Sequence, residues 1–222
     1  MFGLDETIAS RSDGAGLLIV VLVAVLLGLR HATDPDHLVA VTALAPSEPG
    51  PRRAARLGAA WGLGHALTLF AFGIPIVLFD AFLPERVQQG AEIAVGLMIV
   101  VLGLWLLVRW RRGDFQLHSH PETHGARTVR QAFAVGLLHG IGGSAGVGLL
   151  LVASIQSRVY ALVALALLAV FTAISMTMLT TGFGTALARA PLVHIAPACG
   201  FGGVAFGVWY ALGALELAPY VF

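Results

Sequence analysis

Four side chains that suit a transition metal interrupt an apolar segment near the start of the chain. Apolar runs at residues 17–29 and 38–45 flank the sequence Arg-His-Ala-Thr-Asp-Pro-Asp-His. A charged residue at the centre of a membrane helix costs about 2.5–3.5 kcal/mol on insertion scales, so these charges need partners. Imidazole and carboxylate together suit a divalent first-row metal, whereas Ca²⁺ and Mg²⁺ prefer more oxygen. The cluster therefore predicts a metal site built from His31, Asp34, Asp36 and His37.

A simpler interpretation is that the cluster only neutralises its own charge. Arg30 and Asp34 have the i, i+4 spacing of an ion pair on a helix. That pair gives no role to Asp36 or to the two histidines. In a continuous helix, His31, Asp34 and His37 share one side, and Asp36 joins them only if Pro35 bends the chain. We therefore favour the metal site over the ion pair alone.

The composition is that of a helical membrane protein. The chain has 222 residues, of which 58% are hydrophobic and 11% charged, and its mean hydropathy is +0.87. Soluble domains contain about 25% charged residues. The apolar runs reach about 20 residues, which is the length that crosses a bilayer as a helix. All 13 fixed positive charges are arginines, and their distribution gives no indication of a nucleic-acid partner.

Hydropathy predicts an all-α polytopic membrane protein with about six transmembrane helices in one domain, residues 1–222. The first apolar segment is too long for one straight crossing, because about 30 residues at 1.5 Å each exceed a hydrocarbon core of roughly 30 Å. Pro35 falls inside it, so we expect this first helix to be broken at the metal motif. The predicted spans are 15–45, 55–79, 89–109, 129–155, 159–187 and 194–218.

Arginine placement predicts the orientation in the membrane. Connections on the cytoplasmic side of a membrane carry an excess of positive charge. The connections after spans one, three and five hold nine arginines, against three on the opposite side, so both termini are expected outside. The nine are Arg52, Arg53, Arg56, Arg109, Arg111, Arg112, Arg127, Arg130 and Arg189, and the three are Arg11, Arg86 and Arg158.

A short internal similarity links the first and fourth spans. Residues 28–32 read Gly-Leu-Arg-His-Ala, and residues 136–140 read Gly-Leu-Leu-His-Gly. Two halves of three spans each must be inverted relative to one another, which is a common plan in transporters. The sequence thus predicts a 3+3 inverted repeat with halves at about 15–109 and 129–218.

Two further histidines are expected at the depth of the first cluster. His65 and His139 each lie about ten residues into a span from the cytoplasmic side, or roughly 15 Å deep. His31 lies roughly 21 Å from the outer face by the same measure, so all three fall between the midplane and the inner third. We expect one metal site fed by several helices. The alternative for each of these histidines is a hydrogen bond between helices.

Two other stretches offer chemistry outside this cluster. The expected cytoplasmic connection 110–128 contains His118, His120 and His124, which either bind metal loosely and hand it on or belong to a solvated linker. Ser144 lies among glycines on the fourth span, which allows an intramembrane serine protease if a histidine base is within reach. That alternative leaves the first cluster without a function.

Three motifs carry a resemblance to a known family. Residues 30–38 (RHATDPDHL) resemble the H-x4-D-H signature of the nickel/cobalt transporters (NiCoT, within the wider NicO group). Residues 64–66 (GHA) resemble that family's second histidine motif, and residues 136–146 (GLLHGIGGSAG) are similar to its short six-span branch, labelled urease accessory transport proteins. The resemblance implies that His31, Asp34, Asp36, His37 and His65 select and pass the metal. Pro35 departs from the alanine of long members, whose extra acidic motifs are absent here.

The sequence thus predicts a permease that moves Ni²⁺ or Co²⁺ into a prokaryotic cell across the cytoplasmic membrane. The ion is the substrate, and no permanently bound cofactor is expected. No G-x4-G-K-S/T motif is present, so the membrane potential is the expected driving force. Partners are the ion, the lipid bilayer and a metalloenzyme maturation pathway, and a homo-oligomer stays open. The alternatives are a metal exporter, a protease using Ser144 and a metal-sensing or assembly subunit.

Overall fold

The regular secondary structure that the computed structural model describes is entirely helical. The described residues are 3–44, 50–79, 84–113, 128–140, 142, 144–187 and 192–218. This agrees with the all-α fold class that the sequence predicts. In chain order the helices are α1 (Gly3–His31), α2 (Pro35–Leu44), α3 (Pro51–Phe79), α4 (Glu85–Arg111), α5 (Val129–His139), α6 (Ser144–Ala153), α7 (Arg158–Leu187) and α8 (Leu192–Ala214).

Four of the described helices are long and apolar enough to cross a membrane, namely α3, α4, α7 and α8. A fifth crossing results if Gly16–His31 and Asp36–Thr42, which meet at an angle of 47°, form one bent span. The predicted fourth span is divided into α5 and α6, with 11 and 10 residues. At 1.5 Å per residue, neither is long enough to cross alone. The count of six spans therefore stays a prediction.

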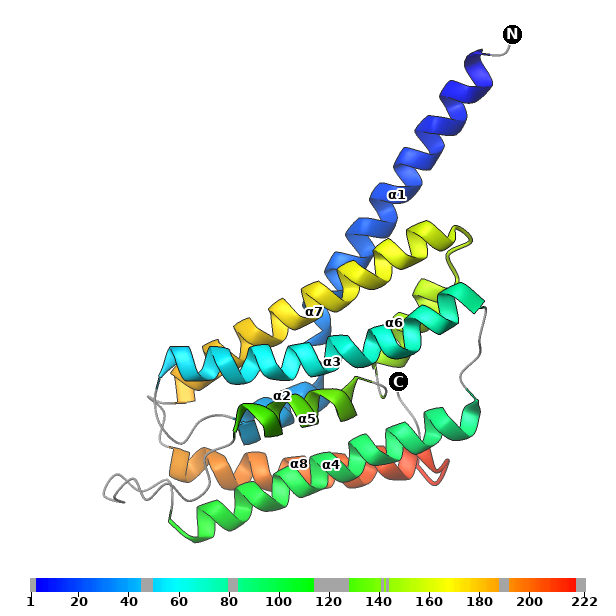
Figure 1. Ribbon diagram of the computed structural model, residues 1–222. Coiled ribbons are helices and arrows are strands. Elements are labelled where there is room, and N and C mark those ends of the chain that lie inside the picture. The colour runs from blue at the N-terminus through cyan, green and yellow to red at the C-terminus, as the bar shows by residue number, and fades with distance from the viewer. Residues whose placement is uncertain are drawn as a thin grey trace.

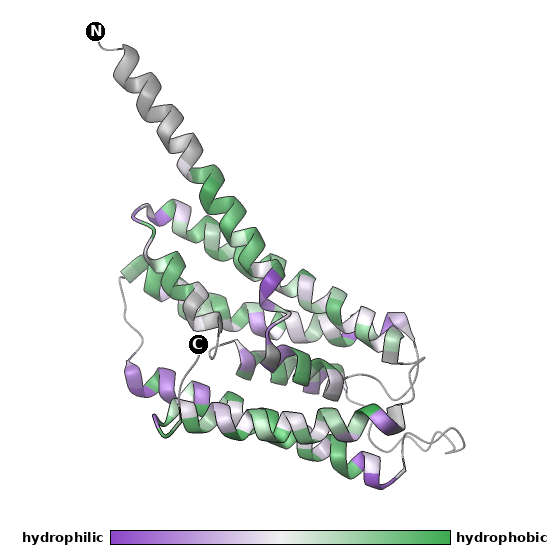
Figure 2. Cartoon of the chain, turned by 180° about the vertical axis from the view of Figure 1, so that it is seen from behind, coloured by the Kyte–Doolittle hydropathy of each residue, from purple (hydrophilic) through white to green (hydrophobic). Residues whose placement is uncertain are grey.

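The break in the first span lies at the metal motif, as Pro35 predicts. After α1 ends at His31, the chain makes a tight turn, in which both the amide and the hydroxyl of Thr33 donate to the Arg30 carbonyl, at 2.9 and 2.6 Å. Pro35 then opens α2, where its missing N–H is not needed. Figure 2 shows these hydrophilic residues as a short band between apolar stretches of helix.

The two pairs of long helices run antiparallel at close range. A Cβ atom on Gly58 of α3 would lie 2.8 Å from Thr180 Cβ on α7, and one on Gly73 would lie 2.7 Å from Leu165 Cδ1. Early residues of α3 thus meet late residues of α7, and Figure 1 shows the two helices side by side. Helices α4 and α8 also run antiparallel in close contact, where Gly96 meets Ala211 and Gly103 meets Gly200. Glycine lets membrane helices approach this closely.

The two helices that end in a histidine each pack on one member of the α3–α7 pair. Gly28 places α1 against α7, and Gly136 places α5 against α3. Each glycine stands three residues before the histidine that ends its helix, His31 or His139. The contact of α1 with α7 therefore matches the contact of α5 with α3, as a 3+3 inverted repeat predicts. The repeat itself stays a prediction that these contacts support.

The close approach of α5 to α3 gives a stability prediction. Gly136→Ala should lower the thermal unfolding midpoint of the detergent-solubilised protein, because the new methyl group would overlap the Trp61 carbonyl oxygen. Overpacking of this kind costs about 1–3 kcal/mol. In the control Gly202→Ala, the added carbon meets nothing within 4 Å, so the midpoint should stay or rise. Equal midpoints for the two variants would contradict the α3–α5 contact.

Candidate metal centre

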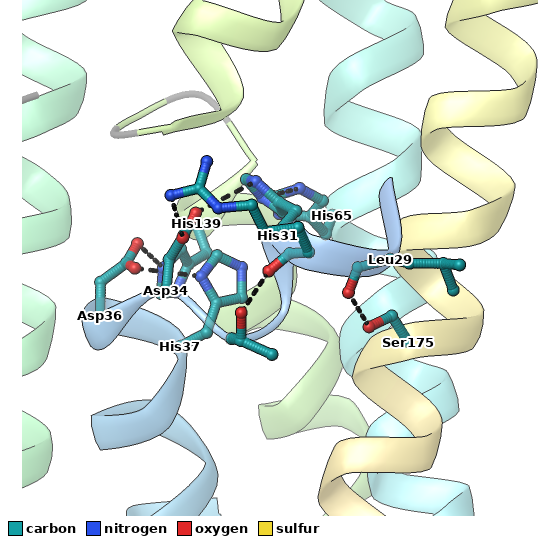
Figure 3. Close-up of polar contacts among 10 residues, drawn as sticks. Leu29, His31, Asp34, Asp36, His37, His65, His139 and Ser175 are labelled. Atoms are coloured by element: carbon teal, nitrogen blue, oxygen red, sulfur yellow. Dashed lines mark hydrogen bonds and ion pairs between the residues drawn. The ribbon is translucent and has the colours of Figure 1, made fainter. Parts of the chain in front are cut away.

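Five of the six side chains predicted on the spans meet at one place inside the bundle. They come from four helices: His31 ends α1, Asp36 and His37 open α2, His65 lies in the middle of α3, and His139 ends α5 (Figure 3). All five are buried, and His37, His65 and His139 have no exposed surface. Two helix breaks bring these residues together, because a straight first span would direct Asp36 away from His31 and His37.

Three imidazoles form the first half of the cluster. His31, His37 and His65 each offer a nitrogen, and the three nitrogens lie within 4.8 Å of one another, close enough to hold a metal ion. His31 Nε2 and His65 Nε2 are 3.0 Å apart, so one donates a hydrogen bond to the other in the neutral state. The His31 and His37 rings are 4.5 Å apart between centroids. This half offers only nitrogen ligands.

The second half of the cluster adds a carboxylate. Asp36, His37 and His139 also offer ligand atoms within 4.8 Å of one another. His139 Nε2 lies 2.6 Å from Asp36 Oδ2, and His37 Nδ1 lies 3.1 Å from Asp36 Oδ1. His37 therefore belongs to both halves. A cation here would meet imidazole nitrogen together with a negative oxygen, a mixed donor set that suits divalent first-row metals.

Asp34 lies beside the cluster and in neither of these groups. Its Oδ1 is 3.8 Å from Arg30 Nη2, and its Oδ2 is 3.7 Å from His31 Nδ1. The ion pair that the simpler interpretation predicts is therefore present at long range, with the Arg30 side chain 74% exposed. A carboxylate behind a metal-binding imidazole fixes the orientation of the ring. Asp34 thus lies next to the His31 ring, and its role as the metal ligand that the sequence predicts stays a prediction.

Several buried ring nitrogens in the cluster lack partners. Within the described residues, His37 Nε2, His65 Nδ1 and His139 Nδ1 form no hydrogen bond. A buried polar atom without a partner costs about 1–3 kcal/mol, so such atoms call for an explanation. An ion that enters the cluster would compensate this cost for any nitrogen that turns toward it.

Trp61 lies on one side of the cluster, and none of the sequence motifs includes it. Its ring centroid lies 5.4 Å from that of His37 and 6.0 Å from that of His139, and the side chain is fully buried. Trp61 stands one helical turn before His65, so their i, i+4 spacing was a usable signal. The indole ring therefore packs beside the His37 and His139 rings.

The side chains of two predicted groups of residues lie outside the described part of the structure. His118, His120 and His124 lie outside the described residues. Ser144 is the first residue of α6, and its side chain also lies outside the described part of the chain. The loop histidines therefore stay a prediction.

A comparison of the sequence with known protein families also indicates a protein that handles a metal ion. A family model described as NicO, high-affinity nickel-transport protein, matches residues 17–144, which include all of the cluster. The chain belongs to the NicO family. Its members are metal transporters and accessory proteins and not catalytic enzymes, which removes the support for a protease at Ser144. No solved structure matches the chain significantly.

Two relatives extend this finding. Urease accessory protein UreH of Bacillus sp. (strain TB-90) is 28% identical over 220 residues, which covers 92% of this chain and 96% of the relative. A protein of Methanocaldococcus jannaschii, MJ1092, whose name suggests a nickel/cobalt efflux system, is 25% identical over 171 residues, which covers 75% of this chain and 76% of the relative. The first relative is thus named for an accessory role and the second for efflux.

The geometry predicts metal-dependent stability. Ni²⁺ at about 100 times its Kd should stabilise the purified protein by about 2.7 kcal/mol and raise its unfolding midpoint. His37→Ala should abolish most of this shift, because His37 belongs to both ligand groups. The control His194→Ala changes an exposed histidine of α8 and should keep the full shift. A shift of wild-type size in His37→Ala would contradict the site.

Proposed function

We propose that this NicO-family chain is a permease that carries Ni²⁺ or Co²⁺ inward across the cytoplasmic membrane of a prokaryote. One observation carries the proposal: four imidazoles and one carboxylate, all buried, meet where α1 and α5 end inside the bundle. Buried ionisable groups within membrane segments mark ion pathways. Broken helices at this depth expose backbone and side chains to a site, as in other transporters.

Each residue of the cluster has a distinct task in this proposal. His31, His37, His65 and His139 replace water around the ion, since neutral imidazole is a good ligand for nickel and cobalt. Asp36 offsets part of the ion's charge, which lowers the cost of dehydration in the bilayer. Asp34 holds His31 in place, and Arg30 limits the negative charge of the empty site.

The arginines support an orientation with both termini outside. The first turns of α3 and α5 and the last turn of α4 lie at one end of the bundle (Figure 1), which we assign to the cytoplasm. Arg86 and Arg158 stand at the opposite end, where α4 and α7 begin. The arginines at the first end are Arg52, Arg53, Arg56, Arg109, Arg111, Arg112 and Arg130.

The membrane potential supplies enough energy for accumulation. A divalent ion that moves to the negative side gains about 4.6 kcal/mol per 100 mV. That energy corresponds to more than three decades of concentration, at about 1.4 kcal/mol per decade. No nucleotide-binding motif is therefore needed on this chain. The relative named as a urease accessory protein supports delivery of the ion to the maturation of a nickel enzyme inside the cell.

Proteoliposomes that enclose a metal-sensitive dye test this function. With the interior negative, wild-type protein should bring Ni²⁺ or Co²⁺ inside and reach a level that follows the imposed potential. Asp36→Asn should slow the uptake about tenfold or more, the effect typical of changed metal-site carboxylates. His194→Ala should transport like the wild type, because that residue is exposed on α8.

The same assay separates import from export, the second candidate that the name of MJ1092 favours. An exporter coupled to another ion gradient would move the metal against the potential once that gradient is imposed. Metal flux that is absent at every potential and gradient would contradict both directions. Such a result would favour a sensor or assembly subunit instead.

A further inference from the structure

The two helix ends that reach the metal centre are held in the same register. A Cβ on Gly28 of α1 would lie 2.9 Å from the Leu168 carbonyl oxygen and 3.0 Å from the Thr172 amide nitrogen. On Gly136 of α5, a Cβ would overlap the Trp61 carbonyl oxygen and lie 3.0 Å from the His65 amide nitrogen. In each case the carbonyl and the amide are four residues apart on the partner helix.

Two hydroxyl groups fix the same correspondence independently. Ser175 Oγ on α7 donates to the Leu29 carbonyl of α1 at 2.7 Å. Thr68 Oγ1 on α3 donates to the Leu137 carbonyl of α5 at 2.9 Å. Each donor stands three residues after the amide named above, and each acceptor stands one residue after the glycine. Helix α7 thus holds α1 by the contacts with which α3 holds α5.

This register makes Thr172 the counterpart of His65. His65 reaches the metal centre from α3, where its ring centroid lies 6.4 Å from that of His139 at the end of α5. Thr172 stands on α7 in the same relation to the end of α1, which is His31. The second half of the chain therefore places a hydroxyl where the first half places an imidazole.

The Thr172 hydroxyl differs from those of the other threonines of α7. Threonine in a membrane helix usually donates to a carbonyl three or four residues earlier. Thr177, Thr180 and Thr181 do so, at 2.6–2.7 Å. Thr172 is only 1% exposed, yet its Oγ1 has no hydrogen-bond partner within the described residues. A buried hydroxyl without a partner is costly and needs a reason.

We propose that Thr172 Oγ1 is a further oxygen contact of the transported ion, provided by α7 in the position that His65 takes on α3. The proposal rests on the proposed function, because it takes the imidazole–carboxylate cluster to be the ion's site. A neutral hydroxyl adds a hard ligand, or a hydrogen bond to water kept by the ion, without adding charge to the bilayer interior. Thr172 would then join His139 as a donor from the second half of the chain.

Binding of Ni²⁺ to purified full-length protein, measured by competition with a chromophoric chelator, tests this contact. Thr172→Val keeps the shape and removes the hydroxyl, so affinity should fall about tenfold, within the range for groups that support a metal. Thr172→Ser should bind within about twofold of the wild type, which is less than 0.5 kcal/mol. The matched control is Thr177→Val, whose hydroxyl already donates to the Ala173 carbonyl and which should bind normally.

The unfolding midpoint without metal separates a contact from packing. Thr172→Val should be at least as stable as the wild type, because it removes a buried polar atom that lacks a partner. Thr172→Ala, a second variant without the hydroxyl, should lose the same binding factor. Wild-type affinity in either variant would overturn the proposal. It would also be overturned if both hydroxyl-free variants were less stable and Thr172→Ser bound as weakly as they did.

Failure of this inference can be told from failure of the proposed function. If the wild-type protein binds Ni²⁺ and transports it while Thr172→Val binds equally well, only the Thr172 contact is wrong. If the wild-type protein binds Ni²⁺ but moves none in proteoliposomes, the proposed transport function is wrong. The Ni²⁺ affinities of the Thr172 variants then still show whether Thr172 contacts the ion. If the wild-type protein binds no Ni²⁺ at all, both are wrong.

Discussion

The structure depends on one constraint: a carboxylate and four imidazoles lie inside a bundle whose outer surface is apolar. Buried groups of this kind must find partners or change their charge. The fold meets this requirement by ending two helices at the cluster. Helices α1 and α5 bring carbonyl ends, which favour a cation, while Asp36 lies in the first turn of α2, where a negative charge is favourable.

Close helix packing follows from the same constraint. The helix ends can meet only if α1 and α5 approach α7 and α3 at backbone distance, and a Cβ at Gly28 or Gly136 would occupy that space. In a bilayer, packing and hydrogen bonds between helices replace the hydrophobic effect as the source of association. The Ser175 and Thr68 hydroxyls add one bond each across these contacts. The glycines and hydroxyls therefore determine where the ligands stand.

The sequence predicts the class of fold and much of the cluster. An apolar composition alone would not locate the cluster, but a polar motif inside an apolar run does, because charge at this depth needs a reason. Depth along the spans correctly grouped His65 and His139 with His31, and Pro35 located the helix break. The position of Asp34 beside His31 was not predictable, since it follows from the tight turn at Thr33. The spacing of Trp61 and His65 offered a signal for the indole ring, whereas the place of Thr172 depends on which helices pair and in which register, which one sequence does not contain.

X-ray absorption spectroscopy of the Ni²⁺-loaded protein shows whether the buried imidazoles bind the ion, because it reports the atoms bound to the metal. We expect a dehydrated ion with several imidazole nitrogens and at least one oxygen as direct ligands. In His37→Ala, which removes the residue shared by both ligand groups, that imidazole signal should shrink or disappear. Only water-like oxygens around the ion in the wild type, or an unchanged spectrum in His37→Ala, would mean that the buried cluster does not bind the metal.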